Sequence, residues 1–504
     1  MKPVRTLRVL SLVLVLVVLS AACGSRLTPE QREVVLAGAA GGGAGGVGAA
    51  GSGEVVGPGG GAGVAAGNGT TAGGAPAQGT AGGGTANGGS AAGGGGGGEA
   101  AGGGGGAQTA AGGGGGGGGA DTRAAPPGGN GGETDTGVTE DTITVANASD
   151  ISGAVPGLFE DAQLAVQAYL EYFKAAEGTV YGRQLKYLPL DTKLNVTGNR
   201  QAYIQACREA FAAVGSMSAF EQGAVEPMRQ CGIPDIRTAA VNDKVMGVET
   251  VYPADASTVG VQPMAEYQYW KKQSPEAVKK AAYLFISSDT TRFQTGQVRA
   301  ATKKIGYDWV YVREIDISET NYDQFVLEMK QEGVRYVTFQ GAYQQAANLA
   351  KSMQRQGFKP DIYALQSNAY TPNYLQSGPV EGTQIAVPSV ILEEADQHAE
   401  LQKYAQWLNQ VSPGEKPTGL GMYAWASAML FVEAIKKVGP KLTREAVIAE
   451  LKKVRDFTGG GLLPPQDIGT KQPADCVVIV EAKGGQFARR APGSDFLCDK
   501  PVKV

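Results

Sequence analysis

Five cysteines and one histidine are the side chains of this sequence most suited to covalent or metal chemistry. Four of the cysteines form two local sets, Cys207 with Cys231 and Cys476 with Cys498. This spacing predicts two disulfide bonds, each closing a loop of roughly twenty residues and contributing roughly 3 kcal/mol to stability. The alternative, a metal site built from four cysteines, needs tighter spacings than these. We therefore expect two disulfides and no bound metal.

The single histidine, His398, is a poor candidate for a catalytic base. A serine or cysteine nucleophile needs its base on a loop beside a pocket. His398 instead lies in the strongly charged run 393–408, which predicts an exposed helix, and the paired acids Glu393 and Glu394 lie in the same run. The sequence contains no P-loop string and no G-x-S-x-G turn. We therefore expect a protein that is not an enzyme and needs no cofactor.

The charge pattern excludes some partners. The net charge is −4 over 504 residues, and no basic run is interleaved with aromatic residues. This composition gives no electrostatic attraction to nucleic acid or to anionic lipid, so we expect neither as a binding partner of the folded part.

The N-terminus has the features of an export signal. Basic residues precede an apolar run at 9–19, which is short for a bilayer span, and Ser20-Ala21-Ala22-Cys23 follows. A cysteine after small residues resembles the lipid-attachment motif of bacterial lipoproteins, although Ser20 replaces the aliphatic residue favoured there. The resemblance implies that residues 1–23 are a signal peptide, that Cys23 is lipidated, and that the protein is extracytoplasmic and membrane-anchored. A plain cleaved signal peptide with an unrelated cysteine is the alternative.

Residues 24–137 have the composition of a flexible linker. Most of the 77 glycines lie between Ala37 and Gly137, among Ala, Ser, Thr and Asn. Such a stretch buries too little apolar surface to offset its ordering entropy, so we expect a disordered tether. The G-x-G-x-x-G strings found here follow no strand, so they predict no dinucleotide site. The folded domain is expected at 138–504.

In the folded part, short apolar runs alternate with segments of helical periodicity. We expect strands in a first round at 142–146, 184–190, 214–219 and 233–238, and in a second round at 281–287, 309–314, 336–340, 361–365 and 383–388. Helices are expected between them, a polar loop at 288–293, and a hairpin at 475–487. Strands that alternate with helices predict parallel sheets covered by helices, so the fold class is α/β with two lobes.

An ordered set of short motifs supports a specific family. The motifs are Tyr181-Gly182-Arg183-Gln184-Leu185, Cys231-Gly232-Ile233-Pro234, Phe293-Gln294-Thr295-Gly296, Gly341-Ala342-Tyr343 and Gly378-Pro379-Val380-Glu381-Gly382. Over 139–504, their order resembles that of the type I periplasmic binding proteins, in particular the branch similar to the leucine/isoleucine/valine-binding proteins of ABC importers.

The resemblance implies two Rossmann-like lobes joined by three crossover segments, near 252–257, 385–389 and 457–461. The first lobe would comprise about 139–254 and 388–456, and the second about 255–387 and 457–504. Ligands of open α/β sheets bind beyond the carboxyl ends of the strands, so the two lobes would enclose a ligand between them by closing about the crossovers.

Matching the family's loops onto this sequence gives a set of candidate ligand-binding residues. They are Ser152, Ser218, Phe220, Glu221, Thr238, Ala240, Asn242, Phe293, Tyr343, Gln366, Asn368, Tyr370 and Tyr423. Aromatic side chains in such a pocket provide contact area, and the polar ones orient the ligand.

The sequence departs from the family at the groups that hold an α-amino acid. Ala219 and Val241 stand where a Ser and a Thr bind the substrate carboxylate, and Gln366 or Ser367 stands where an acid binds the ammonium group. We therefore expect a ligand other than a branched-chain amino acid, such as an aromatic acid, an amide or another small organic molecule. Arg237 and Arg292 are candidates for a bidentate contact to a carboxylate, or else ordinary structural residues.

Three functions are open at this point. The resemblance implies a monomeric substrate-binding protein that delivers a small solute to the permease of an ABC importer. A membrane-tethered ligand sensor would share the same fold. A cell-wall-associated enzyme or structural protein is the third alternative.

Overall fold

The structure is a computed structural model that describes residues 122–256 and 259–504. The expected signal peptide, Cys23 and most of the expected linker lie outside these residues and stay predictions. No helix of the described residues combines the length and the hydropathy that crossing a membrane requires.

The first lobe is built on a four-stranded parallel sheet in the order β2-β1-β3-β4. Its β1 is buried from Val145 to its end, as a β-branched and small-residue run requires when helices cover both faces. The strands are β1 Thr142–Ser149, β2 Gln184–Asp191, β3 Ala212–Val214 and β4 Asp235–Ile236, and a parallel pair β5 Ala239–Ala240 with β6 Asp255–Ala256 follows.

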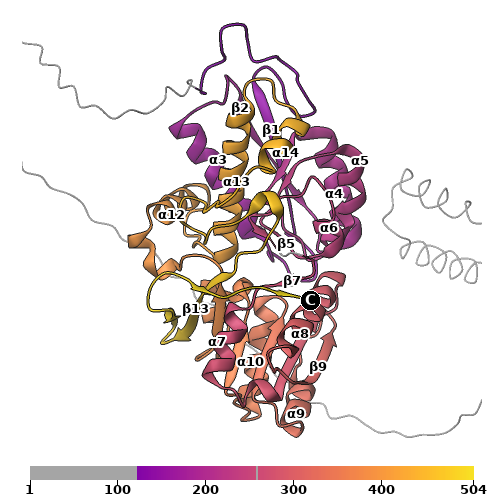
Figure 1. Ribbon diagram of the computed structural model, residues 1–504, viewed down its shortest axis with the longest axis vertical. Helices are drawn as coiled ribbons and strands as arrows, with labels where there is room; N and C mark the ends of the chain where they lie inside the picture. The colour runs from indigo at the N-terminus through magenta and orange to yellow at the C-terminus, as the bar shows by residue number, and fades with distance from the viewer. Residues whose placement is uncertain (1–121, 257–258) are drawn as a thin grey trace, which may run out of the picture. The chain divides into compact units, whose positions relative to one another are not determined.

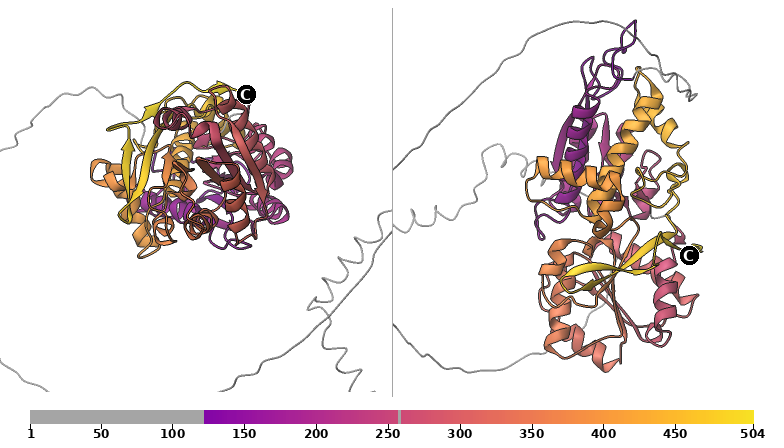
Figure 2. Two further views of the ribbon diagram at one scale, coloured as in Figure 1. Left: turned by 90° about the horizontal axis from the view of Figure 1, so that it is seen from below. Right: turned by 90° about the vertical axis from the view of Figure 1, so that its left-hand side faces the viewer.

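Helices from both ends of the folded chain cover this sheet. In Figures 1 and 2 the orange α13 lies beside the purple α3, although the two are far apart in the sequence. The helices are α3 Glu160–Ala176, α4 Val196–Glu209, α5 Val225–Cys231, α6 Asp243–Met246, α12 Ala399–Val411, α13 Gly419–Val438 and α14 Arg444–Leu451.

The second lobe contains an eight-stranded sheet with the path β14-β13-β12-β11-β10-β8-β9, to which β15 adds by pairing with β13. It is parallel from β9 to β12, while β13 and β14 are antiparallel. The strands are β8 Ala281–Ile286, β9 Trp309–Ile315, β10 Tyr336–Gln340, β11 Ile362–Leu365, β12 Gln384–Val387, β13 Cys476–Lys483, β14 Gln486–Ala491 and β15 Leu497–Cys498. The helices are α7 Ala265–Gln273, α8 Asp289–Lys303, α9 Asp323–Gln331, α10 Tyr343–Arg355 and α11 Pro372–Gln376.

Short elements complete the chain. β7 Val261–Gln262 pairs antiparallel with β16 Val502–Lys503, next to the C-terminus. The short 3₁₀ helices are η2 Glu221–Ala224, η3 Val278–Lys280, η4 Ser367–Ala369, η5 Leu392–Gln397 and η6 Ile468–Thr470.

The chain passes between the lobes three times, as predicted. The first passage begins at β6, and the second follows β12, after which the Val390 N–H donates to the Leu462 carbonyl in the first lobe. The third passage is later than the expected 457–461. Gly469 donates to the Val454 carbonyl, and Lys471 donates to the Val248 carbonyl at 2.8 Å, so the first lobe extends to about 471. The Gly-rich run at 459–461 misled the sequence analysis because it is a turn within the lobe.

Both predicted disulfides are present. Cys207 and Cys231 join the ends of α4 and α5, with 5.9 Å between their Cα atoms, and Cys476 and Cys498 join the paired strands β13 and β15. No group of three or more His, Cys, Asp or Glu side chains within 122–256 and 259–504 is arranged to hold a metal ion.

The segment 122–137, which its composition places in the linker, is bound to the first lobe where the structure begins. The Tyr181 N–H donates to the Thr122 carbonyl at 2.7 Å, and the buried Arg183 guanidinium donates to the Asn130 carbonyl at 2.8 Å. These are backbone contacts, which composition alone does not predict.

Candidate functional site

A cleft of about 210 Å³ lies where strand ends of the two lobes face each other. Met217, Ser218 and Leu420 line it from the first lobe, and residues of α7, α8, the end of β8 and the loops after β10 and β11 line it from the second. All three passages between the lobes also contribute, through Asp255, Pro388 and Pro473 among others. This is the place where ligands of open α/β sheets bind.

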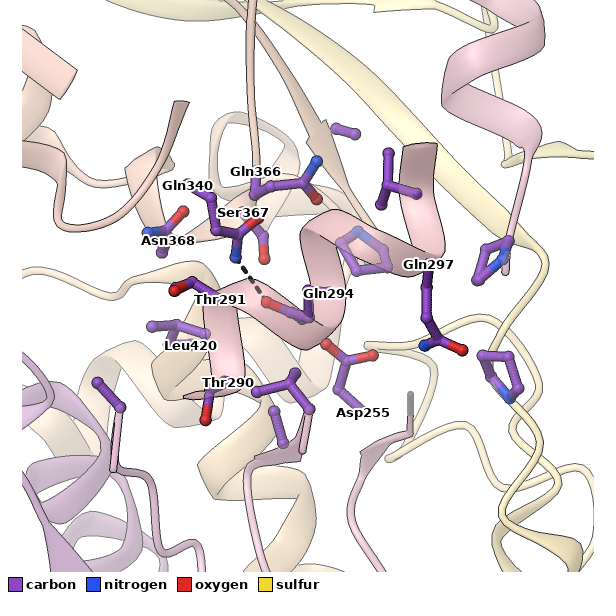
Figure 3. Close-up of a pocket in the computed structure, with 18 of the residues that line it drawn as sticks. Asp255, Thr290, Thr291, Gln294, Gln297, Gln340, Gln366, Ser367, Asn368 and Leu420 are labelled. Atoms are coloured by element: carbon purple, nitrogen blue, oxygen red, sulfur yellow. Dashed lines mark hydrogen bonds between the residues drawn. The ribbon is translucent and has the colours of Figure 1, made fainter. Parts of the chain in front are cut away.

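Helix α8 provides the largest set of polar groups in the cleft. Ser288 caps the helix by accepting a hydrogen bond from the Thr291 N–H at 3.1 Å, so the first helical turn starts directly after β8. Thr290, Thr291, Gln294 and Gln297 therefore recur at three- and four-residue spacing on one helical face that lines the cleft (Figure 3).

The sequence analysis wrongly placed a polar loop at 288–293. The sequence does contain a signal for the helix, because Ser288 followed by Asp-Thr-Thr is typical of an N-cap and a helix start. Phe293, predicted to contact ligand from that loop, is on α8 instead and does not line the cleft.

The loop after β11 lies on the same side of the cleft, as predicted for Gln366 and Asn368. Asn368 donates from its amide to the Gly341 carbonyl, and Gln340 donates to the Gln294 Oε1 at 2.8 Å. Figure 3 shows these amides gathered near α8. The hydrogen bond between Gln340 and Gln294 joins two of these amides, and the bond from Asn368 ends on the backbone, so protein contacts orient these side chains before any ligand arrives.

On the first-lobe side, Ser218 lines the cleft, but its hydroxyl donates to the Asp150 carboxylate at 2.9 Å. The Ala219 N–H donates to the other Asp150 oxygen at 2.7 Å, and Thr192 also donates to this carboxylate. Burial raises the pKa of Asp150, and these hydrogen bonds oppose the rise. Asp150 thus holds the loop that carries Ser218.

Glu221 has a similar role one loop further on. Its Oε1 accepts from the N–H groups of Val241 at 2.9 Å and Asn242 at 2.5 Å, and its Oε2 lies 3.2 Å from the Arg237 guanidinium. Burial raises the pKa of Glu221 while Arg237 lowers it. Glu221 and Arg237 form an internal network and do not line the cleft, and Arg292 is an exposed partner of Glu314.

A second cavity of about 250 Å³ adjoins the first, and both are lined by Leu158, Phe159, Ser367, Asn368 and Leu420. Two predicted residues, Tyr343 and Tyr370, line this cavity. The other candidates line neither cavity. Ser152 is exposed and donates to Asp191, and Tyr423 is buried and donates to the Pro388 carbonyl; the remaining ones are Phe220, Glu221, Thr238, Ala240, Asn242 and Phe293.

Two carboxyl groups in the cleft were missed by the sequence analysis. Asp255 lies on the first passage, and in Figure 3 its carboxylate points toward α8. Glu266 lies on α7, four residues before the buried Trp270 and therefore on the same buried helical face. The sequence does contain a signal for Glu266, because an acidic residue on the apolar face of a helix is unusual and indicates a functional role.

Burial alone raises the pKa of Asp255 to about 7. Burial also raises the pKa of Glu266 to about 7, and the neighbouring Asp255 charge adds to this rise. Within the described chain, the Glu266 Oε2 and the Thr290 Oγ1 are buried without a hydrogen-bond partner. Such groups are rare in folded proteins and mark places where a ligand can supply the missing partner.

Comparisons with known proteins agree with this geometry. A family model described as "Periplasmic binding protein" matches residues 142–486. The chain matches no curated protein at a significant level.

Solved structures share the fold. A leucine binding protein from Thermotoga maritima has 16% identity and a TM-score of 0.58, covering 69% of this chain and 98% of its own. A branched-chain amino acid transporter substrate binding protein from Streptococcus pneumoniae, in complex with isoleucine, has 16% identity and a TM-score of 0.59, with coverages of 69% and 99%. A fatty acid ABC transporter substrate-binding protein from Thermomonospora curvata has 21% identity and a TM-score of 0.62, with coverages of 72% and 95%.

The matched segment spans the first sheet, strands β8 to β13 of the second sheet, the three passages and every residue that lines the cleft. The chain therefore belongs to the periplasmic binding protein family and has the type I fold of the binding proteins of ABC transporters.

Proposed function

We propose that this protein captures a small organic solute in the cleft between its lobes and delivers it, chemically unchanged, to the permease of an ABC importer. It acts outside the cytoplasm as a monomer, held to the membrane by a lipid on Cys23 and by the Gly-rich linker. It is a binding protein and not an enzyme.

The observation that carries the proposal is that the cleft is lined by residues from different parts of the fold. Both lobes and all three passages contribute residues, so any rotation of one lobe against the other changes the cleft. A solute that contacts both lobes favours the closed arrangement by its differential affinity, and closure is the signal that a permease can recognise.

The solved relatives support the size and nature of the solute. They are a leucine binding protein, a binding protein in complex with isoleucine and a fatty acid ABC transporter substrate-binding protein, and these three solutes are small organic molecules. A volume of about 210 Å³, lined by amides, hydroxyls and apolar side chains, fits a solute of the same class.

Thermal unfolding of the purified full chain against a panel of amino acids, amides, amines, organic acids and short peptides tests the proposal. A solute present at one hundred times its dissociation constant should stabilise the protein by about 2.7 kcal/mol. Ser367 lines both cavities, so Ser367→Trp should fill the cleft and abolish the shift, whereas Ser494→Trp on an exposed loop should keep it.

Three further measurements complete the test. Mass spectrometry should recover the bound solute unchanged, and cells lacking this chain should lose uptake of the labelled solute. Fatty-acid labelling should disappear in a Cys23→Ser variant. A solute that is chemically converted, or a panel in which no compound stabilises the protein, would overturn the proposal, and normal uptake without the chain would favour a sensor.

A further inference from the structure

The charged side chains of the cleft all have the same sign. Asp255 and Glu266 line the first cavity, and Glu160, Asp161 and Glu415 line the second. Among the described residues that line either cavity there is no lysine, arginine or histidine. Because low-dielectric walls focus such charges, the cleft attracts cations and repels anions.

Three backbone donors in the first-lobe loops beside the cleft are already used. The Ala219 N–H is bound by the Asp150 carboxylate, and the N–H groups of Val241 and Asn242 are bound by the Glu221 carboxylate. A ligand carboxylate approaching these loops meets protein carboxylates where it would need free N–H donors. The loops therefore disfavour an anionic ligand for a second, independent reason.

One of the cleft acids lacks the partners that a buried carboxylate needs. Glu266 is 6% exposed, and its Oε2 accepts no hydrogen bond from any described residue. The hydroxyl of Thr290, a residue that is 4% exposed, is also unpartnered, and both residues line the first cavity. An acceptor-only group and a hydroxyl that both lack partners match a ligand that donates several hydrogen bonds, such as an ammonium group with three N–H donors.

We infer that the cleft binds a solute that carries a protonated amine and no carboxylate, with the amine held by Asp255 and Glu266 and assisted by Thr290. This inference rests on the proposed function and names its substrate class. The amine replaces the missing hydrogen-bond donors and supplies the opposite charge that the acidic walls lack. The rest of the solute lies along the apolar side chains and amides of the cleft.

Two matched sets of compounds test the inference by isothermal titration calorimetry on the full chain. The first set is 3-methylbutylamine, 3-methylbutanoate and leucine; the second is 2-phenylethylamine, 3-phenylpropanoate and phenylalanine. Each set keeps one apolar skeleton and varies only the charged groups. We expect an amine to bind, the matching acid to give no heat of binding, and the matching amino acid to bind at least tenfold more weakly than the amine.

Variants locate the amine. Asp255→Asn and Glu266→Gln should each weaken amine binding at least tenfold, while Glu171→Gln, at a half-exposed ion pair on α3, should leave it unchanged. Thermal melts of the free variants show whether each is folded. Binding of an acid or an amino acid in preference to the amine, or amine binding that both cleft variants retain, would overturn the inference. If neither amine binds but another class from the broad panel does, this inference falls and the transport proposal stands; if nothing binds, both fall.

Discussion

Replacing Glu266 by Gln should stabilise the ligand-free protein at pH 8 and have little effect at pH 4. The folded structure raises the pKa of this carboxyl from its ordinary value of 4.5 to about 7, mainly through burial. Below pH 4.5 the group is protonated in both the folded and the unfolded chain, so it does not distinguish them. Above pH 7 it is ionised in both, and only the folded chain bears the unfavourable burial of the charge.

The magnitude follows from the two pKa values. A rise from 4.5 to about 7 corresponds to about 3 kcal/mol of destabilisation once the carboxyl is ionised. The wild-type protein should therefore lose about 3 kcal/mol through this group as the pH rises from 4.5 to 7, and Glu266→Gln should not. Gln and protonated Glu are similar in size and hydrogen bonding, so the difference between the proteins at pH 4 should be small.

The tyrosines around Glu266 do not titrate in the pH range where Glu266 changes its charge. Tyr267, Tyr283, Tyr307 and Tyr336 keep their protons because burial raises the pKa of each hydroxyl above its ordinary value. Asp255 titrates in the same range and repels Glu266, so part of the effect depends on it. In an Asp255→Asn background the gain from Glu266→Gln should accordingly be smaller.

Urea denaturation at pH 4, 6 and 8, with wild type and Glu171→Gln as references, measures this directly. The gain at pH 8 should appear as about 3 kcal/mol in the free energy of unfolding, and in a thermal melt as a melting temperature higher by about 6 °C, taking roughly 2 °C per kcal/mol for a large domain. An equal difference between the proteins at pH 4 and pH 8, or a less stable variant at pH 8, would refute the assignment of Glu266 as a buried, unpartnered carboxyl.

Other perturbations have distinct expected sizes, all measurable by chemical denaturation. Cys207→Ser, which opens the loop closed by Cys231, should lose about 3 kcal/mol, and the loss should vanish if both proteins are compared in strong reductant. Arg237→Met leaves two buried carboxylates without their cation and should lower the free energy of unfolding by about 3–5 kcal/mol. Arg292→Met, at an exposed ion pair, should lower it by less than about 1 kcal/mol. Equal losses in the two variants would contradict the buried network. Gly198→Ala places a Cβ 2.2 Å from a backbone carbonyl oxygen and should lose about 1–3 kcal/mol, so a neutral result would show that this close approach is absent.

Most of the fold was accessible from the sequence because its signals are local. The strand Tyr336–Gln340 was predicted with the bounds that the structure gives, since it is a short apolar run that Gly341 ends. The start of α8 and the end of the first lobe were not predicted. Their positions depend on a helix cap and on a turn, whose roles are decided by tertiary contacts. Periodicity predicts the interior of an element better than its ends.

The site was harder to predict because a family's loops show where ligand atoms lie but not which side chain reaches them. Ser218, Gln366 and Asn368 follow strands and do line the cleft. Asp255 and Glu266 do not follow strands in that way, since one is on a passage between lobes and the other is inside a helix. Side chains of that kind enter a cleft only through the packing of two lobes, which local pattern does not encode.

The carboxyl groups around this cleft separate into two kinds, and the difference is what identifies the binding site. Asp150 and Glu221 are buried but accept hydrogen bonds from N–H groups, so their burial is compensated within the protein and they serve to fix loops. Glu266 is buried at the cavity wall and its Oε2 accepts no hydrogen bond from a described residue, and Asp255 lines the same cavity.

The second arrangement destabilises the free protein, and it becomes favourable only when a cation enters the cleft and supplies both charge and donors. The same energy that the free protein loses by holding Glu266 ionised is then recovered on binding. A cationic ligand therefore stabilises the closed arrangement most strongly above pH 7, where the carboxyls are ionised before it arrives, and affinity should fall as the pH drops toward 5.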